Sequence, residues 1–118
     1  WLVVHLLLRG LSALELLAGS HATHALTIGA IGGLTLGMMT RTARGHTGRV
    51  LVADGFELTM FLLIQAAALA RVFGGMVLPD FYMASVQLSA VLWAAAMGLY
   101  AVRYWPVLTR ARLDGKPG

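Results

Sequence analysis

Two of the four histidines in this chain are spaced for a shared ligand site. His21 and His24 are three residues apart, so in a helix they lie one turn apart on adjoining faces. A neutral imidazole binds transition metals and serves as an axial ligand of haem iron. At a membrane surface the same ring can instead contact only water or lipid headgroups. The spacing leaves both roles open for this pair.

The other two histidines stand apart from that pair in the sequence. His5 belongs to the first apolar stretch, and His46 lies in the basic turn GHTGR at residues 45–49. We expect the histidines to divide by depth into an outer pair, His21 and His24, and an inner pair, His5 and His46. The candidate cofactor ligands are His21, His24 and His46. The candidate metal ligands are His5, His24 and His46.

Other ligand types are scarce. The chain has no cysteine, which excludes thiolate metal sites and the C-x-x-C-H attachment of covalent haem. Met38, Met39 and Met60 offer soft thioethers for Cu(I), although methionine in membrane helices usually packs. No Walker-type loop, G-x-S-x-G or H-E-x-x-H motif is present, so hydrolase and nucleotide-binding roles have no support.

The composition indicates that these residues are carried by membrane helices. The chain is 58% hydrophobic and 12% charged, whereas a soluble domain has roughly 25% charged residues. Two windows, 16–40 and 81–102, contain no Asp, Glu, Lys or Arg, and each can cross about 30 Å of hydrocarbon. We predict an all-α, multi-pass membrane protein with four antiparallel transmembrane helices in an up-down-up-down bundle, at residues 2–17, 21–42, 51–73 and 81–104. Residues 1–106 form this unit, and residues 107–118 are predicted to be a flexible cytoplasmic tail.

The distribution of charge supports that topology. A net charge of +4 and a pI of about 10.4 would suggest nucleic acid binding in a soluble domain. Here the cations gather in the connection at residues 41–49 and after residue 102, which is the positive-inside pattern of a membrane protein. We therefore expect a lipid bilayer and no nucleic acid as partner, with both clusters and the C-terminus in the cytoplasm.

A row of small residues marks the second predicted helix. Ala25, Gly29, Gly33 and Gly37 are spaced four apart and fall on one side of a helix. Such a face usually lets another membrane helix approach closely. It can also leave room for a flat ligand such as a porphyrin, and the sequence does not choose between the two.

The charged residues of the predicted membrane helices that we consider as intramembrane partners are Arg9, Glu15, Glu57 and Arg71. Intramembrane charges usually find partners. From the expected depths we predict two ion pairs, Arg9 with Glu57 and Glu15 with Arg71.

The segment HALTIGAIGGLTLGMMTRTARGHTGR, residues 24–49, closely resembles the segment that marks the NnrS family of haem- and copper-containing bacterial membrane proteins. The residues that match the family are His24, at the start of this segment, and His46, in the GHTGR turn. The resemblance implies an inner-membrane protein linked to nitric oxide metabolism, denitrification and nitrosative stress, with non-covalent haem b and copper. It also implies that this chain is the C-terminal part of a longer multi-pass protein, with nitric oxide or a related small molecule as ligand.

The sequence therefore leads to one main hypothesis and one rival. The main hypothesis is a haem- and copper-binding membrane protein of the nitric oxide response. The rival is a membrane transporter or assembly subunit without bound metal, in which the polar residues line a path or pack against partner helices. Whether the protein is an enzyme is left open.

Overall fold

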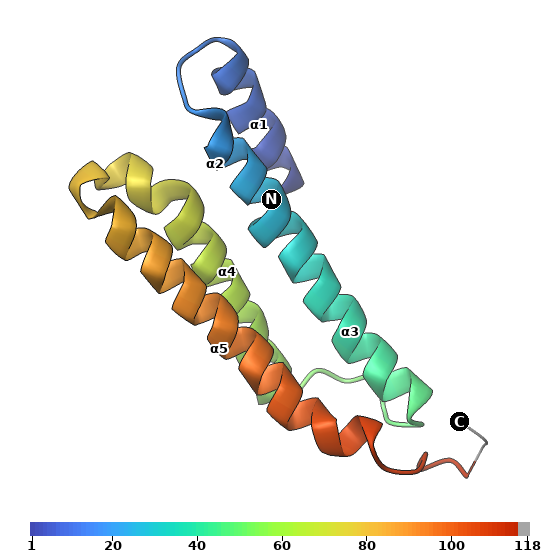
Figure 1. Ribbon diagram of the computed structural model, residues 1–118. Coiled ribbons are helices and arrows are strands. Elements are labelled where there is room, and N and C mark those ends of the chain that lie inside the picture. The colour runs from blue at the N-terminus through green and yellow to red at the C-terminus, as the bar shows by residue number, and fades with distance from the viewer. Residues whose placement is uncertain (116–118) are drawn as a thin grey trace.

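Helices make up nearly all of the chain that the structure describes (Figure 1). A computed structural model describes residues 1–115, and no strand occurs among them. The elements are α1 (Leu2–Ala13), α2 (Gly19–His24), the π-helix η1 (Ala25–Gly32), α3 (Gly33–His46), α4 (Gly55–Val77), the short 3-10 helix η2 (Pro79–Phe81) and α5 (Tyr82–Leu108). The predicted all-α class is confirmed.

Three of the helical segments are long and apolar enough to cross a membrane. They are Gly19–His46, which joins α2, η1 and α3 end to end, then Gly55–Val77 and Pro79–Leu108. The first segment, α1, has only 12 residues, fewer than the roughly 20 that a bilayer requires. The membrane character of the fold is thus supported, whereas the fourth crossing at residues 2–17 and the alternation of four helices across a bilayer remain predictions.

The helices α4 and α5 form the most closely packed pair, an antiparallel hairpin (Figure 1). Gly74 makes this approach possible, because a Cβ atom there would lie 2.6 Å from Cβ of Ser85. Deeper in the pair, the buried Ser89 hydroxyl donates to the carbonyl of Ala67 at 2.8 Å. The chain reverses at Pro79, as proline disfavours continuation of the preceding helix, and α4 runs through Gly74 without a break.

The predicted small-residue row lies partly in η1, whose i→i+5 turn is wider than that of an α-helix. A Cβ atom at Gly29 would lie 2.4 Å from Cδ2 of Trp1, and one at Gly33 would lie 3.3 Å from Nε2 of Gln65. The Trp1 indole N–H also donates to the Gln65 side chain at 2.5 Å. The row therefore faces α1 and α4. Gly37 does not have the packing role predicted for it, because a Cβ atom at this position would meet no described atom within 4 Å.

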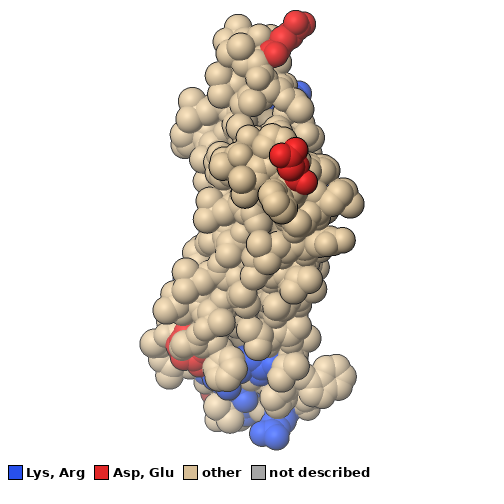
Figure 2. Space-filling model, turned by 90° about the vertical axis from the view of Figure 1, so that its left-hand side faces the viewer, with Lys and Arg blue, Asp and Glu red and all other residues tan. Residues whose placement is uncertain are grey.

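The charged side chains gather toward the two ends of an elongated molecule that measures 58 × 26 × 18 Å. On the face shown in Figure 2, a broad band without charged side chains separates the ends. One end, here called the charged end, carries the last turns of α3 and α5 and the start of α4 (Figure 1). The opposite end, here called the histidine end, carries α1 and α2. A central apolar band between polar ends is the pattern expected of a protein that spans a bilayer.

The close approach at Gly29 gives a first prediction. Gly29→Ala should lower the free energy of unfolding by roughly 1–3 kcal/mol, because the new methyl group would overlap the Trp1 ring. The measurement is thermal unfolding of the purified protein in detergent. Gly37→Ala is the matched control and should be neutral or stabilising, since its Cβ meets open space and alanine favours helix. Equal unfolding temperatures for the two variants would contradict the packing assigned to Gly29.

Candidate functional site

Three of the four histidines lie at the histidine end of the molecule, on α1 and α2. His5 on α1 places its Nδ1 atom 2.7 Å from the carbonyl oxygen of Ala22. His21 on α2 places its Nδ1 atom 2.9 Å from the carbonyl oxygen of Val72 on α4. Both rings are half-buried, so each is held in one orientation by a neighbouring helix.

These two contacts determine which nitrogen of each ring carries the proton. A backbone carbonyl only accepts hydrogen bonds, so Nδ1 of His5 and of His21 must be the donor. In a neutral imidazole the other nitrogen, Nε2, then carries a free lone pair. Histidines that bind metals are usually arranged in this way, with the second ring N–H bonded to a carbonyl or carboxylate.

His24 is the third histidine at this end. It is half-buried, and no hydrogen bond to its ring occurs within residues 1–115. The side chains of Arg71 and His21 lie close enough to interact with it electrostatically. The structure thus brings His24 together with His21, as their spacing suggests.

The position of His5 corrects the predicted division by depth. His5 contacts Ala22 and therefore lies with His21 and His24 rather than with His46. The physical reason is the way α1 packs: Trp1 lies against Gly29, near the middle of the next segment, and His5 lies against Ala22, so the rest of α1 runs from there toward the histidine end.

His46 is exposed at the charged end, in the last turn of α3. It lines an open groove together with Met38, Met39 and Tyr100. The turn that follows contacts the C-terminal segment, where the Leu113 N–H donates to the Thr47 carbonyl at 3.2 Å. Gly48 takes a positive φ of 71° in this turn. The other three histidines lie on α1 and α2 at the opposite end of the molecule. His46 consequently has no partner histidine near it in the described part of the chain.

Among the described residues, the histidine end offers single imidazole ligands rather than a cluster of metal ligands. No group of three or more His, Asp or Glu side chains that could hold a metal ion occurs within residues 1–115. A haem iron needs only one or two axial ligands from the protein, and His5 or His21 presents a suitable Nε2 atom. A copper site would need ligands in addition to those that the described residues bring together.

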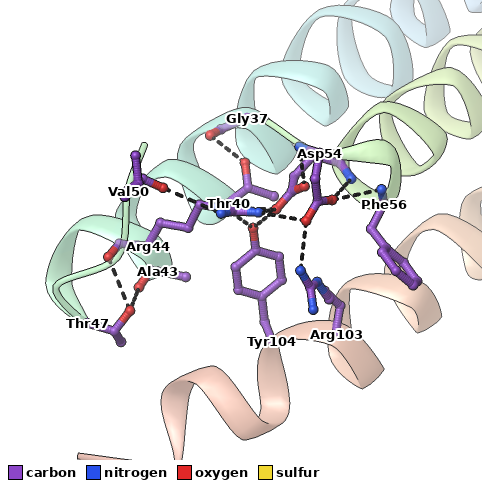
Figure 3. A network of polar contacts seen from close by, with 11 residues as sticks. Gly37, Thr40, Ala43, Arg44, Thr47, Val50, Asp54, Phe56, Arg103 and Tyr104 are labelled. Atoms are coloured by element: carbon purple, nitrogen blue, oxygen red, sulfur yellow. Dashed lines mark hydrogen bonds and ion pairs between the residues drawn. The ribbon is translucent and has the colours of Figure 1, made fainter. Parts of the chain in front are cut away.

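The charged end contains a network of ionised side chains that joins three helices (Figure 3). Arg44 of α3 donates through Nη2 to Oε1 of Glu57 at 2.6 Å and to Oδ2 of Asp54 at 3.0 Å. The hydroxyl of Tyr104, on α5, also donates to Oε1 of Glu57. Arg103, next to it, donates to Oδ2 of Asp54 at 2.7 Å. The two guanidinium groups thus balance the charges of the two carboxylates. Of these, Glu57 is only 9% exposed.

Asp54 and Glu57 have a second, local role in starting α4. Oδ1 of Asp54 accepts from the backbone N–H groups of Phe56 at 2.8 Å and of Glu57 at 3.4 Å, while Oε2 of Glu57 accepts from the N–H of Asp54 at 2.9 Å. This reciprocal arrangement is a capping box. The pKa of the Asp54 carboxyl is lowered by its interaction with the Glu57 side chain, and further by Arg103 and the backbone N–H groups.

Neither predicted intramembrane ion pair is formed. Glu57 pairs with Arg44, so the predicted pair with Arg9 is wrong; α1 lies at the opposite end of the molecule (Figure 1). Arg71 contacts Tyr82, with its guanidinium 5.6 Å from the ring centroid. Glu15 forms no ion pair among the described residues and is exposed in the turn after α1.

Sequence comparison identifies the family to which this chain belongs. The model of the family described as "NnrS protein" matches residues 1–112. The chain is a member of the NnrS family. Searches of curated proteins and of solved structures found no match.

Membership of the NnrS family and three long apolar helices together indicate a membrane protein. The match includes both the histidine end and the network around Glu57. The sequence analysis named the histidines as candidate ligands, but it did not predict the contacts of Arg44, Arg103 and Tyr104. The pattern Asp54-x-x-Glu57 was a usable signal, because an Asp followed three residues later by Glu marks a helix start.

The network gives a second prediction. Arg44→Gln should lower the free energy of unfolding by about 3 kcal/mol, because it leaves the buried Glu57 carboxylate without its cation. Thermal unfolding in detergent measures the effect. The double variant Arg44→Gln, Glu57→Gln should recover part of the loss, since it removes the uncompensated charge.

Arg41→Gln is the matched control for this prediction, because Arg41 is exposed and forms no ion pair within residues 1–115. Its unfolding free energy should stay within about 0.5 kcal/mol of the parent protein. An Arg44→Gln variant as stable as Arg41→Gln would show that the network does not stabilise the fold.

Proposed function

We propose that this NnrS-family protein is a haem- and copper-binding protein of the bacterial inner membrane that acts in nitric oxide metabolism and in resistance to nitrosative stress. The family match supports the nitric oxide context. The observation that supports haem binding is the fixed tautomer of His5 and His21, each of which presents a free Nε2 atom at the histidine end.

The surroundings of these imidazoles suit a bound porphyrin in two ways. The carbonyls of Ala22 and Val72 orient the rings and raise the basicity of the ligating nitrogen. α1 also exposes apolar side chains, among them Leu6 and Leu7, and a porphyrin face needs apolar surface. A bound haem would supply the iron that binds nitric oxide, and the chain would hold and orient the axial imidazole.

The proposed topology follows from charge. Arg41, Arg44 and Arg49 end the first long segment, and Arg110 and Arg112 follow the last one. By the positive-inside rule the charged end, with the C-terminus, lies in the cytoplasm. The haem site at the histidine end then lies toward the outer face of the membrane. Within this topology α1 belongs to a fourth crossing.

A third prediction tests haem binding. The purified protein, expressed with ample haem, should show a Soret absorbance band. Replacing an axial imidazole removes a bond to iron, so His21→Ala or His5→Ala should abolish the band or shift its maximum. His24→Ala belongs in the same series, because His24 lies beside His21.

His46→Ala is the matched control, since His46 lies on the last turn of α3 at the opposite end of the molecule. Its spectrum should equal that of the parent protein. Elemental analysis of the same samples tests for copper. Absence of any Soret band would contradict the proposal and favour the transporter or assembly role without bound metal. An unchanged band in the three histidine-end variants would clear those residues of haem ligation.

A further inference from the structure

A groove lies between α3 and the start of α4, on the side of α3 where Gly37 stands. It consists of two adjoining pockets of about 270 and 260 Å³. The two pockets share four lining residues, Gly37, Thr40, Ala53 and Glu57. Gly37 lines both pockets without a side chain, and a Cβ atom there would meet no described atom within 4 Å.

The two ends of the groove differ in chemistry. The pocket nearer the charged end is lined by Arg41 and Arg44 together with Leu51 and Val52. The other pocket is lined by apolar side chains, Leu36, Leu58 and Phe61. A cationic mouth therefore leads into an apolar channel along the helices.

The mouth carries one uncompensated positive charge. Arg44 is engaged by Glu57 and Asp54, so its charge is balanced within the network. Arg41, one turn earlier on α3, is exposed and forms no ion pair with any described residue. The groove is therefore complementary to a ligand with an anionic head and an apolar body.

The connection that borders the mouth is itself suited to contact with lipid. Val50, Leu51 and Val52 are consecutive and are 75%, 55% and 61% exposed. Three adjoining apolar side chains exposed to water would be unfavourable. At the boundary between headgroups and acyl chains they would instead be in contact with lipid.

We propose that this groove binds one anionic phospholipid, with its phosphate at Arg41 and an acyl chain along Gly37 between Leu36 and Phe61. Cations at the cytoplasmic face attract anionic lipid headgroups, and the pocket beyond supplies a specific place for the chain. This lipid site is independent of the haem site, which lies at the other end of the molecule.

Native mass spectrometry of the delipidated protein in detergent tests the proposal. The protein is titrated with phosphatidylglycerol and, separately, with phosphatidylcholine, whose headgroup has no net charge. One molecule of phosphatidylglycerol should bind saturably and more tightly than phosphatidylcholine. Arg41→Gln should weaken phosphatidylglycerol binding about fivefold, as expected for the loss of one interfacial cation.

Gly37→Leu should prevent saturable binding of both lipids, because the new side chain fills the groove. The space around Gly37 admits the first side-chain atom without a contact within 4 Å, and thermal unfolding checks that the variant is folded. Arg110→Gln is the matched control, an exposed cation at the same end that does not line the groove.

Each outcome bears on the proposal. Weakened binding in Arg41→Gln and Gly37→Leu, with unchanged binding in Arg110→Gln, supports it. Equal affinity for the two lipids in the parent protein overturns the assignment of an anionic headgroup. An equal loss of phosphatidylglycerol affinity in Arg41→Gln and Arg110→Gln would show diffuse attraction to the charged end. Saturable binding that survives Gly37→Leu would place the lipid elsewhere. Either result overturns the proposed site.

Discussion

The contact between Arg44 and Glu57 connects parts of the chain that have little else to hold them together in lipid. Helices in a bilayer gain almost nothing from the hydrophobic effect when they associate, because the acyl chains are as apolar as leucine. An ion pair whose two partners also form hydrogen bonds supplies a directional attraction between the helices. Arg44 comes from α3, Glu57 from α4 and the Tyr104 hydroxyl from α5, so one carboxylate links the three longest elements. Because a buried carboxylate without a cation is costly, other arrangements of these helices at the charged end are disfavoured.

The histidine end is held by different means. There, small residues let backbones come close enough for side chains to reach main-chain groups. Buried Ala22 and Ala25 allow α1 and α4 to approach the second segment, and His5 and His21 then bond to carbonyls of the facing helices. The orientation of each imidazole consequently depends on helix packing rather than on the local sequence around it. The imidazoles are therefore held rigidly only when the helices are in place.

The sequence was enough to locate the three long helical segments, but it was not enough to predict which side chains pair between them. Long apolar runs free of charge locate a membrane helix almost by themselves, because burial of backbone polar groups in lipid leaves few alternatives. The predicted segments at 21–42, 51–73 and 81–104 accordingly correspond to the three long helical segments of the structure. The predicted pair of Arg9 with Glu57 was wrong because it required Arg9 to lie near the charged end, whereas α1 packs beside α2 at the histidine end. His5 was assigned to the wrong end for the same reason.

The π-helix η1 was also not predicted from the sequence. It affects how the histidine end and the charged end are rotated relative to each other about the helix axis. It occupies Ala25–Gly32, directly after His24 and before the helix that carries Arg44. A turn closed by i→i+5 bonds winds more slowly than an α-helix, so this stretch sets the rotation of the histidines relative to the arginines on one continuous segment. Packing determines that rotation: His21 must face Val72 while Arg44 faces Glu57, both on the same helix α4. Both ends of the segment are held against α4, so the number of residues per turn between them has to adjust. The glycines of η1 tolerate this change because they have no side chain to displace.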